Sequence, residues 1–178
     1  LDNVSIKEVY NYKPALAIQG FDGTSLLNLG DVWGNMNMGK LTLAQNTGTH
    51  NTALGSDALA GNTTASDNTA AGYRALFSNT TGYSNSAFGS LALNQNTTGY
   101  GNTAQGNGAL SHNISGDNNT AIGYGAGAHL VTGSANTLIG ATAGGGNAMS
   151  GNGNIALGPD SGDFGSGSSN FSAGISSQ

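Results

Sequence analysis

The amino-acid sequence predicts an all-β protein, a parallel β-solenoid (β-roll) of about seven to eight coils. The first observation is a five-residue phrase, Asn-x-Ala-x-Gly in most copies, that returns every seventeen residues. Self-similarity at a fixed period indicates a stacked repeat architecture. The second is that Gly and Asn/Thr turns divide each period into stretches too short for a helix. The third is that Ala, Leu and Ile recur at fixed places, which distinguishes this glycine-rich chain from a disordered one.

The repeated phrase occurs in seven clear copies. The first six begin 17 residues apart, the seventh follows after 18, and a weaker copy, NMNMG, begins 16 residues before the first. The clear copies are NTALG, NTAAG, NSAFG, NTAQG, NTAIG, NTLIG and NIALG, beginning at Asn51, Asn68, Asn85, Asn102, Asn119, Asn136 and Asn154. Repeat positions are numbered from this asparagine, and the solenoid domain is predicted to span residues 35–158.

Residues 1–34 precede the array and differ from it, since they contain Pro14 and the sole tryptophan, Trp33. The segment VSIKEVYNY alternates apolar and polar residues as a strand does. The segment ALAIQGFDGTSLLNLGDVW predicts two strands joined by a turn at Asp22-Gly23. We interpret this part as an N-terminal β segment that caps the array or connects it to something upstream, because terminal units of solenoids are usually atypical.

Position five of the repeat is glycine in every clear copy, which predicts a coil corner with a positive φ or a close backbone approach. These glycines are Gly55, Gly72, Gly89, Gly106, Gly123, Gly140 and Gly158. Position eight is alanine in six copies, and position nine is leucine in four before it becomes Gly127 and Gly144. We expect two short strands per coil, stacked in register at ~4.8 Å, so that seven coils form a rod on the order of 35 Å long.

Alanines at position eight, such as Ala75, Ala92 and Ala109, are predicted to form one interior column. A core of Ala, Leu and Gly is thin, so an isolated coil stack is short of buried apolar area and oligomerisation would supply the rest. After Gly158 the pattern decays. We expect residues 159–178 to form a Gly/Ser-rich tail or linker, with Phe164 and Phe171 packed onto neighbouring chains.

Charge and hydropathy argue against nucleic-acid partners and membrane insertion. The net charge is −5, and four basic residues cannot build a patch that neutralises phosphates. No apolar run approaches the ~20 residues of a membrane span. The chain has no cysteine, which excludes disulfides and thiolate metal sites.

No arrangement in the sequence predicts catalysis. We interpret His50, His112 and His129 as isolated polar residues at turns, and no familiar hydrolase or phosphate-binding motif is present. Asp160 and Asp163 could hold a cation, but the recurring aspartate of calcium-binding repeats is missing. The prediction is a protein that is not an enzyme and holds no cofactor or metal.

Asparagines at position one are the most regular polar feature, and we expect them to stack and hold the coils in register. They are Asn51, Asn68, Asn85, Asn102, Asn119 and Asn136. Threonine follows at position two, as in Thr103. A flat threonine array could instead order water as an ice-binding face. Against that, adjacent pairs such as Thr63-Thr64 and Thr80-Thr81 point to opposite sides of a strand.

Exposed tyrosines are the candidate receptor or glycan contacts. Tyr83 and Tyr100 share one repeat position, and Tyr73 and Tyr124 share another. A tyrosine offers a flat apolar face that stacks on a sugar ring and a hydroxyl that bonds the sugar hydroxyls. Packing between coils or chains is the structural alternative for the same residues.

The unit NTAAGYRALFSNTTGYS, residues 68–84, resembles the 17-residue repeats of phage tail-fibre proteins and of tail-fibre-domain proteins of bacterial genomes. It is similar, more distantly, to the head repeats of trimeric autotransporter adhesins. The resemblance covers roughly residues 35–158. It implies a homotrimer of parallel chains, located on a virion or a cell surface, that binds a host-surface glycan or protein receptor. An ice-binding solenoid is the alternative function. A glycan-cleaving enzyme is the third hypothesis and ranks last, because coils this narrow offer no cleft for a substrate.

Overall fold

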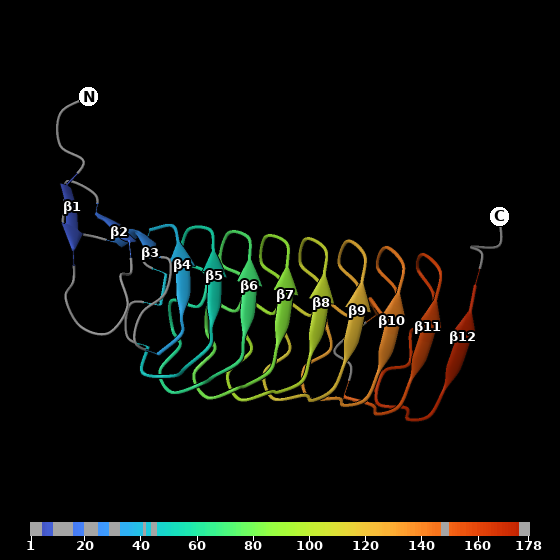
Figure 1. Cartoon of the computed structure of the whole chain (residues 1–178). Coiled ribbons are helices and arrows are strands. Elements are labelled where there is room, and N and C mark those ends of the chain that lie inside the picture. The colour runs from blue at the N-terminus through green and yellow to red at the C-terminus, as the bar shows by residue number, and fades with distance from the viewer. Residues whose placement is uncertain are drawn as a thin grey trace.

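The computed structural model describes residues 5–8, 16–19, 25–28, 33–40, 42–43, 46–146 and 150–174. Successive coils stack into a rod, and each contributes one strand to a single sheet along its length (Figure 1). The described residues contain no helix. The predicted all-β class and the parallel β-solenoid are therefore confirmed.

The parallel part of the sheet consists of nine three-residue strands. They are β4 (Met36–Met38), β5 (Thr52–Leu54), β6 (Thr69–Ala71), β7 (Ser86–Phe88), β8 (Thr103–Gln105), β9 (Thr120–Ile122), β10 (Thr137–Ile139), β11 (Ile155–Leu157) and β12 (Phe171–Ala173). Neighbours pair in register, so that each repeat position lies beside itself; Thr69 pairs with Ser86, for example, and Ser86 with Thr103. The weak copy NMNMG supplies β4, which makes it a full member of the array.

The N-terminal segment continues the same sheet with strands of alternating direction. Strands β1 (Ser5–Glu8), β2 (Leu16–Gln19) and β3 (Ser25–Asn28) pair antiparallel in sequence order, and β3 pairs antiparallel with β4. The three strands expected upstream of the array are present. The turn expected at Asp22-Gly23 lies outside the described residues.

Two sequence expectations differ from the structure. The solenoid does not end at residue 158, because β12 pairs in parallel with β11 and adds a further coil. Asn170 and Gly174 keep the Asn-x-x-x-Gly spacing 16 residues after Asn154, which is the signal that the Gly/Ser-rich composition obscured. Phe164 is partly buried against the core of its own chain.

Each coil also has one strand rather than two. In residues 46–146, the second apolar stretch forms turns, since the position-nine leucines adopt positive φ values, such as 51° at Leu59 and 52° at Leu76. A strand requires φ near −120°, so these residues cannot join a second sheet. Backbone hydrogen bonds still link the coils there, as from Leu59 N–H to Ala75 O at 3.0 Å.

The interior of the rod keeps one buried leucine in each of the six coils between residues 51 and 146, although its position changes. The position-nine leucines Leu59, Leu76, Leu93 and Leu110 are fully buried, as are Leu130 at position twelve and Leu138 at position three. The last two belong to the coils in which position nine is Gly127 or Gly144. A Cβ added to Gly144 would lie 2.8 Å from Leu138 Cδ2, so the two positions compete for one volume.

Candidate functional site

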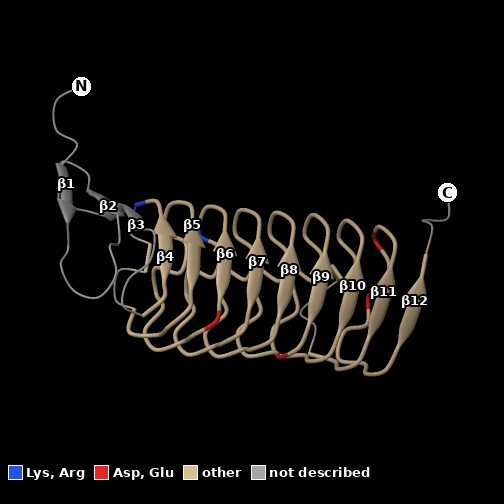
Figure 2. Ribbon diagram, viewed as in Figure 1, with Lys and Arg blue, Asp and Glu red and all other residues tan. Residues whose placement is uncertain are grey.

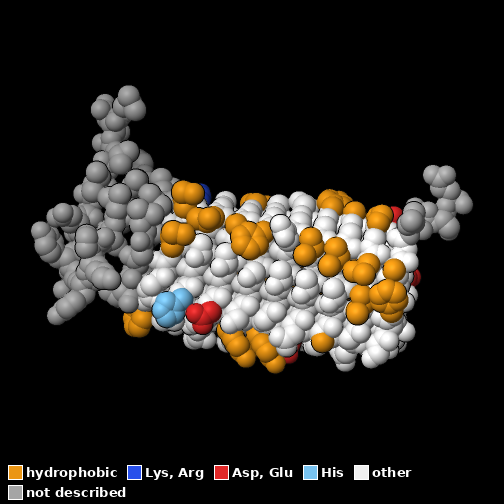
Figure 3. All heavy atoms as spheres, turned by 45° about the vertical axis from the view of Figure 1, so that its right-hand side comes forward, with side chains coloured by type: hydrophobic (Ala, Val, Ile, Leu, Met, Phe, Trp, Pro, Cys, Tyr) orange, Lys and Arg blue, Asp and Glu red, His pale blue; other side chains and the backbone are white. Residues whose placement is uncertain are grey.

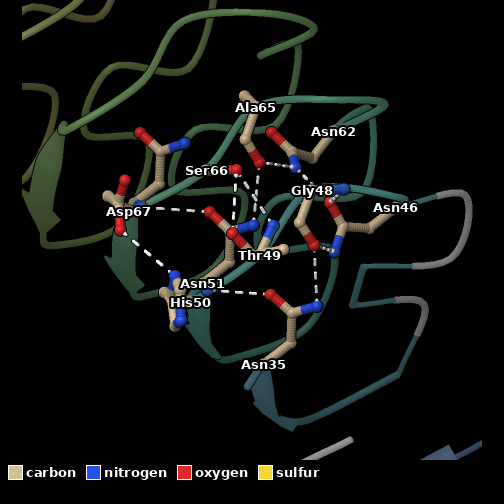
Figure 4. A network of polar contacts seen from close by, with 11 residues as sticks. Asn35, Asn46, Gly48, Thr49, His50, Asn51, Asn62, Ala65, Ser66 and Asp67 are labelled. Carbon is tan, nitrogen blue, oxygen red and sulfur yellow. Dashed lines mark hydrogen bonds and ion pairs between the residues drawn. The ribbon is translucent and has the colours of Figure 1, made fainter. Parts of the chain in front are cut away.

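The position-one asparagines lie inside the rod and form a ladder between coils (Figure 4). Each Oδ1 accepts the backbone N–H of the next asparagine, as Asn51 does from Asn68 at 3.0 Å and Asn68 from Asn85 at 2.9 Å. In the five coils that begin at Asn51 to Asn119, Nδ2 donates to the position-fifteen carbonyl of its own coil; from Asn68 to Gly82 O the distance is 2.9 Å. The ladder satisfies buried backbone groups that the short strands leave open, so its role is structural.

A second buried asparagine ladder runs along position twelve, which the sequence analysis treated only as a turn phrase. Its members are Asn62, Asn79, Asn96 and Asn113. Asn79 Nδ2 donates to Asn62 Oδ1 and to Gly82 O, both at 2.9 Å, so both ladders meet at the same carbonyl. The ladder ends at Asn113, whose Oδ1 has no hydrogen-bond partner because the next position twelve is Leu130.

The position-five glycines are required by close backbone approach. Their φ values are positive, from 126° at Gly55 to 143° at Gly72 among the six regular coils. A Cβ added to Gly55 would lie 2.7 Å from Gly72 O. The same contact between glycine and the next glycine carbonyl recurs at Gly72, Gly89, Gly106, Gly123 and Gly140. These residues determine the coil spacing and offer no binding group.

The four candidate tyrosines do not converge. Tyr83 and Tyr100 lie at position sixteen, ahead of the strands, while Tyr73 and Tyr124 lie at position six, after them. Tyr83 and Tyr100 stack with ring centroids 4.8 Å apart and an angle of 2° between the rings. The two rings form a stacked pair on one edge of the rod, and Tyr83 is exposed.

Tyr73 and Tyr124 have different surroundings although they share a repeat position. The Arg74 guanidinium lies 5.3 Å from the centroid of the Tyr73 ring and 4.9 Å from that of Phe77. Arg74 Nε also lies 3.4 Å from Asp57 Oδ2. Tyr124, three coils away, is 67% exposed and lines a hollow in the surface. Tyr124 therefore combines an open ring with a concave surface.

The outer sheet face, made of positions two and four of strands β4–β12, is the largest feature that the sequence analysis did not identify. The middle residue of each strand from β4 to β11 points into the core and its neighbours point outward. No residue of these nine strands is charged (Figure 2). Hydrophobic side chains recur along the rod in Figure 3. The exposed large members are Met38, Phe88, Ile122, Ile139, Ile155, Leu157 and Phe171.

The described histidines take part in local side-chain contacts. Among the described residues, no group of three His, Cys, Asp or Glu side chains could hold a metal ion. His50 Nδ1 lies 3.5 Å from Asp67 Oδ1 in an exposed contact. Treating the histidines as isolated is wrong for His112 and His129, which share position eleven and stack with ring centroids 5.4 Å apart.

Comparison of the chain with protein-family models, with curated proteins and with solved structures finds no match. Within the described residues, no helix has the length and apolar character needed to cross a membrane.

Proposed function

We propose that this chain is a structural segment of a fibre or adhesin, assembled as a homotrimer and displayed on a virion or a cell surface. In this proposal the rod presents side chains that attach to a host-surface glycan or protein. The outer sheet face is the observation that carries it. Large exposed apolar side chains recur along this uncharged face beside a row of Thr and Ser, and exposed apolar surface of this kind marks an interaction site.

The outer sheet face is too small to form a standard protein interface by itself. Nine strands about 4.8 Å apart and ~10 Å long give a footprint of roughly 400 Å². A standard interface contributes about 800 Å² per partner, so flanking turns would have to join the contact. In a trimer each chain contacts two neighbours, so the turns that flank the sheet face would be covered together with the face itself.

Native mass spectrometry at micromolar concentration tests the assembly. We expect a trimer, and we expect Ile122→Asp to dissociate it because a carboxylate would be buried without a partner. Ile114→Asp is the matched control: Ile114 is similarly exposed but lies at position thirteen, away from the sheet. A well-folded monomer of the unchanged protein would contradict the proposal.

Attachment is tested separately at the tyrosine pair. Replacing Tyr83 and Tyr100 together with Ala should weaken attachment to target cells, because the stacked pair, with Tyr83 exposed, offers aromatic surface and hydroxyls to a sugar. The free energy of unfolding should change by no more than about 0.5 kcal/mol, as for most surface substitutions. Unchanged attachment would remove this pair from the proposed contact.

An ice-binding solenoid is a second candidate, and the position-two threonines support it. Thr69, Thr103 and Thr120 lie half-buried in register on the outer sheet face, whereas Thr63 and Thr80 use their hydroxyls to bond the next coil. Phe88 and Gln105 interrupt the flat array at position four. Thermal hysteresis in the unchanged protein that is lost in Thr103→Tyr would favour ice binding over attachment. We expect no hysteresis.

A further inference from the structure

A hollow of about 240 Å³ lies beside Tyr124, on the turns that follow strands β8, β9 and β10. Its lining includes Gly108 and Gly125 at position seven and Ala128 at position ten. The coils before it carry larger residues at position seven, namely Asp57, Arg74 and Leu91. The hollow therefore arises where the repeat replaces bulky side chains with glycine in two consecutive coils.

The backbone does not require glycine at these two positions. The backbone at position seven is left-handed also where the residue is not glycine, with a φ of 61° at Leu91 and 53° at Arg74. These values are close to the 68° of Gly108 and the 61° of Gly125. A Cβ added to Gly108 would meet no atom within 4 Å, and one added to Gly125 would meet only Thr142 Cγ2 at 3.5 Å. The same backbone thus accepts side chains elsewhere, and the open space is a property of this part of the rod.

The rim of the hollow combines one aromatic face with uncharged polar groups. The Tyr124 ring is exposed, and the Asn107 amide and the Tyr124 hydroxyl make no hydrogen bond to other described residues. His129 stacks on His112, which is held by a 2.7 Å hydrogen bond between its Nδ1 and Ala128 O. None of the residues that line the hollow is Asp, Glu, Lys or Arg.

We propose that this hollow binds one unit of a neutral saccharide. The C–H face of a sugar ring would stack on Tyr124, and its hydroxyls would bond Asn107, Ser111 and the His129 ring. The lack of charged groups favours a neutral ligand over a phosphate or a cation. The volume lies below the roughly 300–1,000 Å³ of sites for drug-sized ligands, so one sugar unit enters and the remaining glycan stays outside.

The biological meaning of this site rests on the proposed attachment role, and it specifies a ligand class for it. A single open subsite of this kind gives a Kd on the order of millimolar. Weak contacts of that size become useful when several copies engage one glycan surface, which a fibre would supply. The experiment below measures sugar binding directly, so its outcome is independent of the oligomeric state and of cell attachment.

Saturation-transfer NMR with the full chain tests the inference. The probes are methyl α-glucoside, methyl β-galactoside, methyl α-mannoside and N-acetylglucosamine, each at millimolar concentration. We expect saturation transfer to the ring protons of at least one probe. Gly125→Leu should weaken this binding at least tenfold, because a leucine side chain, which Leu91 carries at the same repeat position two coils earlier, would fill the hollow. Tyr124→Ala, an exposed substitution that removes the stacking face, should do the same.

Gly153→Ser is the matched control. Gly153 has a φ of 66°, its added Cβ would meet no atom closer than 3.6 Å, and it lies directly before a position-one asparagine, as does Ser84, which adopts a φ of 55°. We expect it to bind the probe as the unchanged protein does. The inference is overturned if no probe receives saturation, or if binding persists in Gly125→Leu or in Tyr124→Ala.

Discussion

A double-mutant cycle at Leu138 and Gly144 tests whether each coil holds one large apolar side chain. Leu138→Ala removes three fully buried carbons, worth about 0.8 kcal/mol each, and leaves a cavity, so we expect a loss of about 3–4 kcal/mol in the free energy of unfolding. Gly144→Leu alone places its Cβ 2.8 Å from Leu138 Cδ2 and should cost about 1–3 kcal/mol through overpacking. The double variant restores the arrangement of the earlier coils, and its cost should fall to about 1 kcal/mol, the residual strain of a left-handed leucine.

Urea unfolding at one fixed protein concentration measures the four free energies, because an oligomer's stability depends on concentration. The predicted coupling is at least about 2 kcal/mol in favour of the double variant. Leu76→Ala combined with Gly144→Leu is the control, since Leu76 lies several coils away and the two costs should add. If the Leu138 and Gly144 costs also add within about 0.5 kcal/mol, the two positions do not share a volume and the reasoning fails.

Three further predictions concern the regular coils. Asn85→Ala should cost about 2–4 kcal/mol in urea unfolding, because it orphans the buried Asn102 N–H that now donates to Asn85 Oδ1 at 2.9 Å; an equally stable variant would show that water replaces the amide. Ala92→Leu should lower stability by about 1–3 kcal/mol, since the side chain is fully buried between stacked coils, and an unchanged melting temperature would contradict the register. Gly89→Ala should cost at least about 2 kcal/mol, because its φ is 135° and the added Cβ would clash with the next coil's carbonyl; hydrogen exchange should show the loosening first at β7 and β8.

The repeat period was sufficient to predict the fold class and the register of the sheet. Identical residues at a spacing of 17 can satisfy their hydrogen bonds only by stacking upon themselves, so Asn51 and Asn68 had to be neighbours. The close approach at Gly55 was equally predictable, because only glycine recurs at a position where a Cβ would meet the next coil.

The sequence could not predict how many strands each coil contains or where the last coil ends. Apolar residues at positions eight and nine suit a strand and a buried turn equally well. The positive φ of Leu59 is imposed by the backbone path around the corner, since leucine has no intrinsic preference for it. Asn170 and Gly174 keep the repeat spacing in a segment whose composition suggested a tail. The parallel pairing of β12 with β11 shows that this segment forms a further coil.

For the candidate site, the sequence determined which tyrosines share a repeat position, because position in the period is position around the coil. Only the tertiary structure decided what each ring meets, since Arg74 covers Tyr73 while glycines at Gly108 and Gly125 open the surface beside Tyr124. It also decided which side of each strand faces outward. The three residues of a strand show that their side chains alternate between two faces. Which of these faces points outward depends on which face the stacked coils enclose, and that is a property of the closed coil.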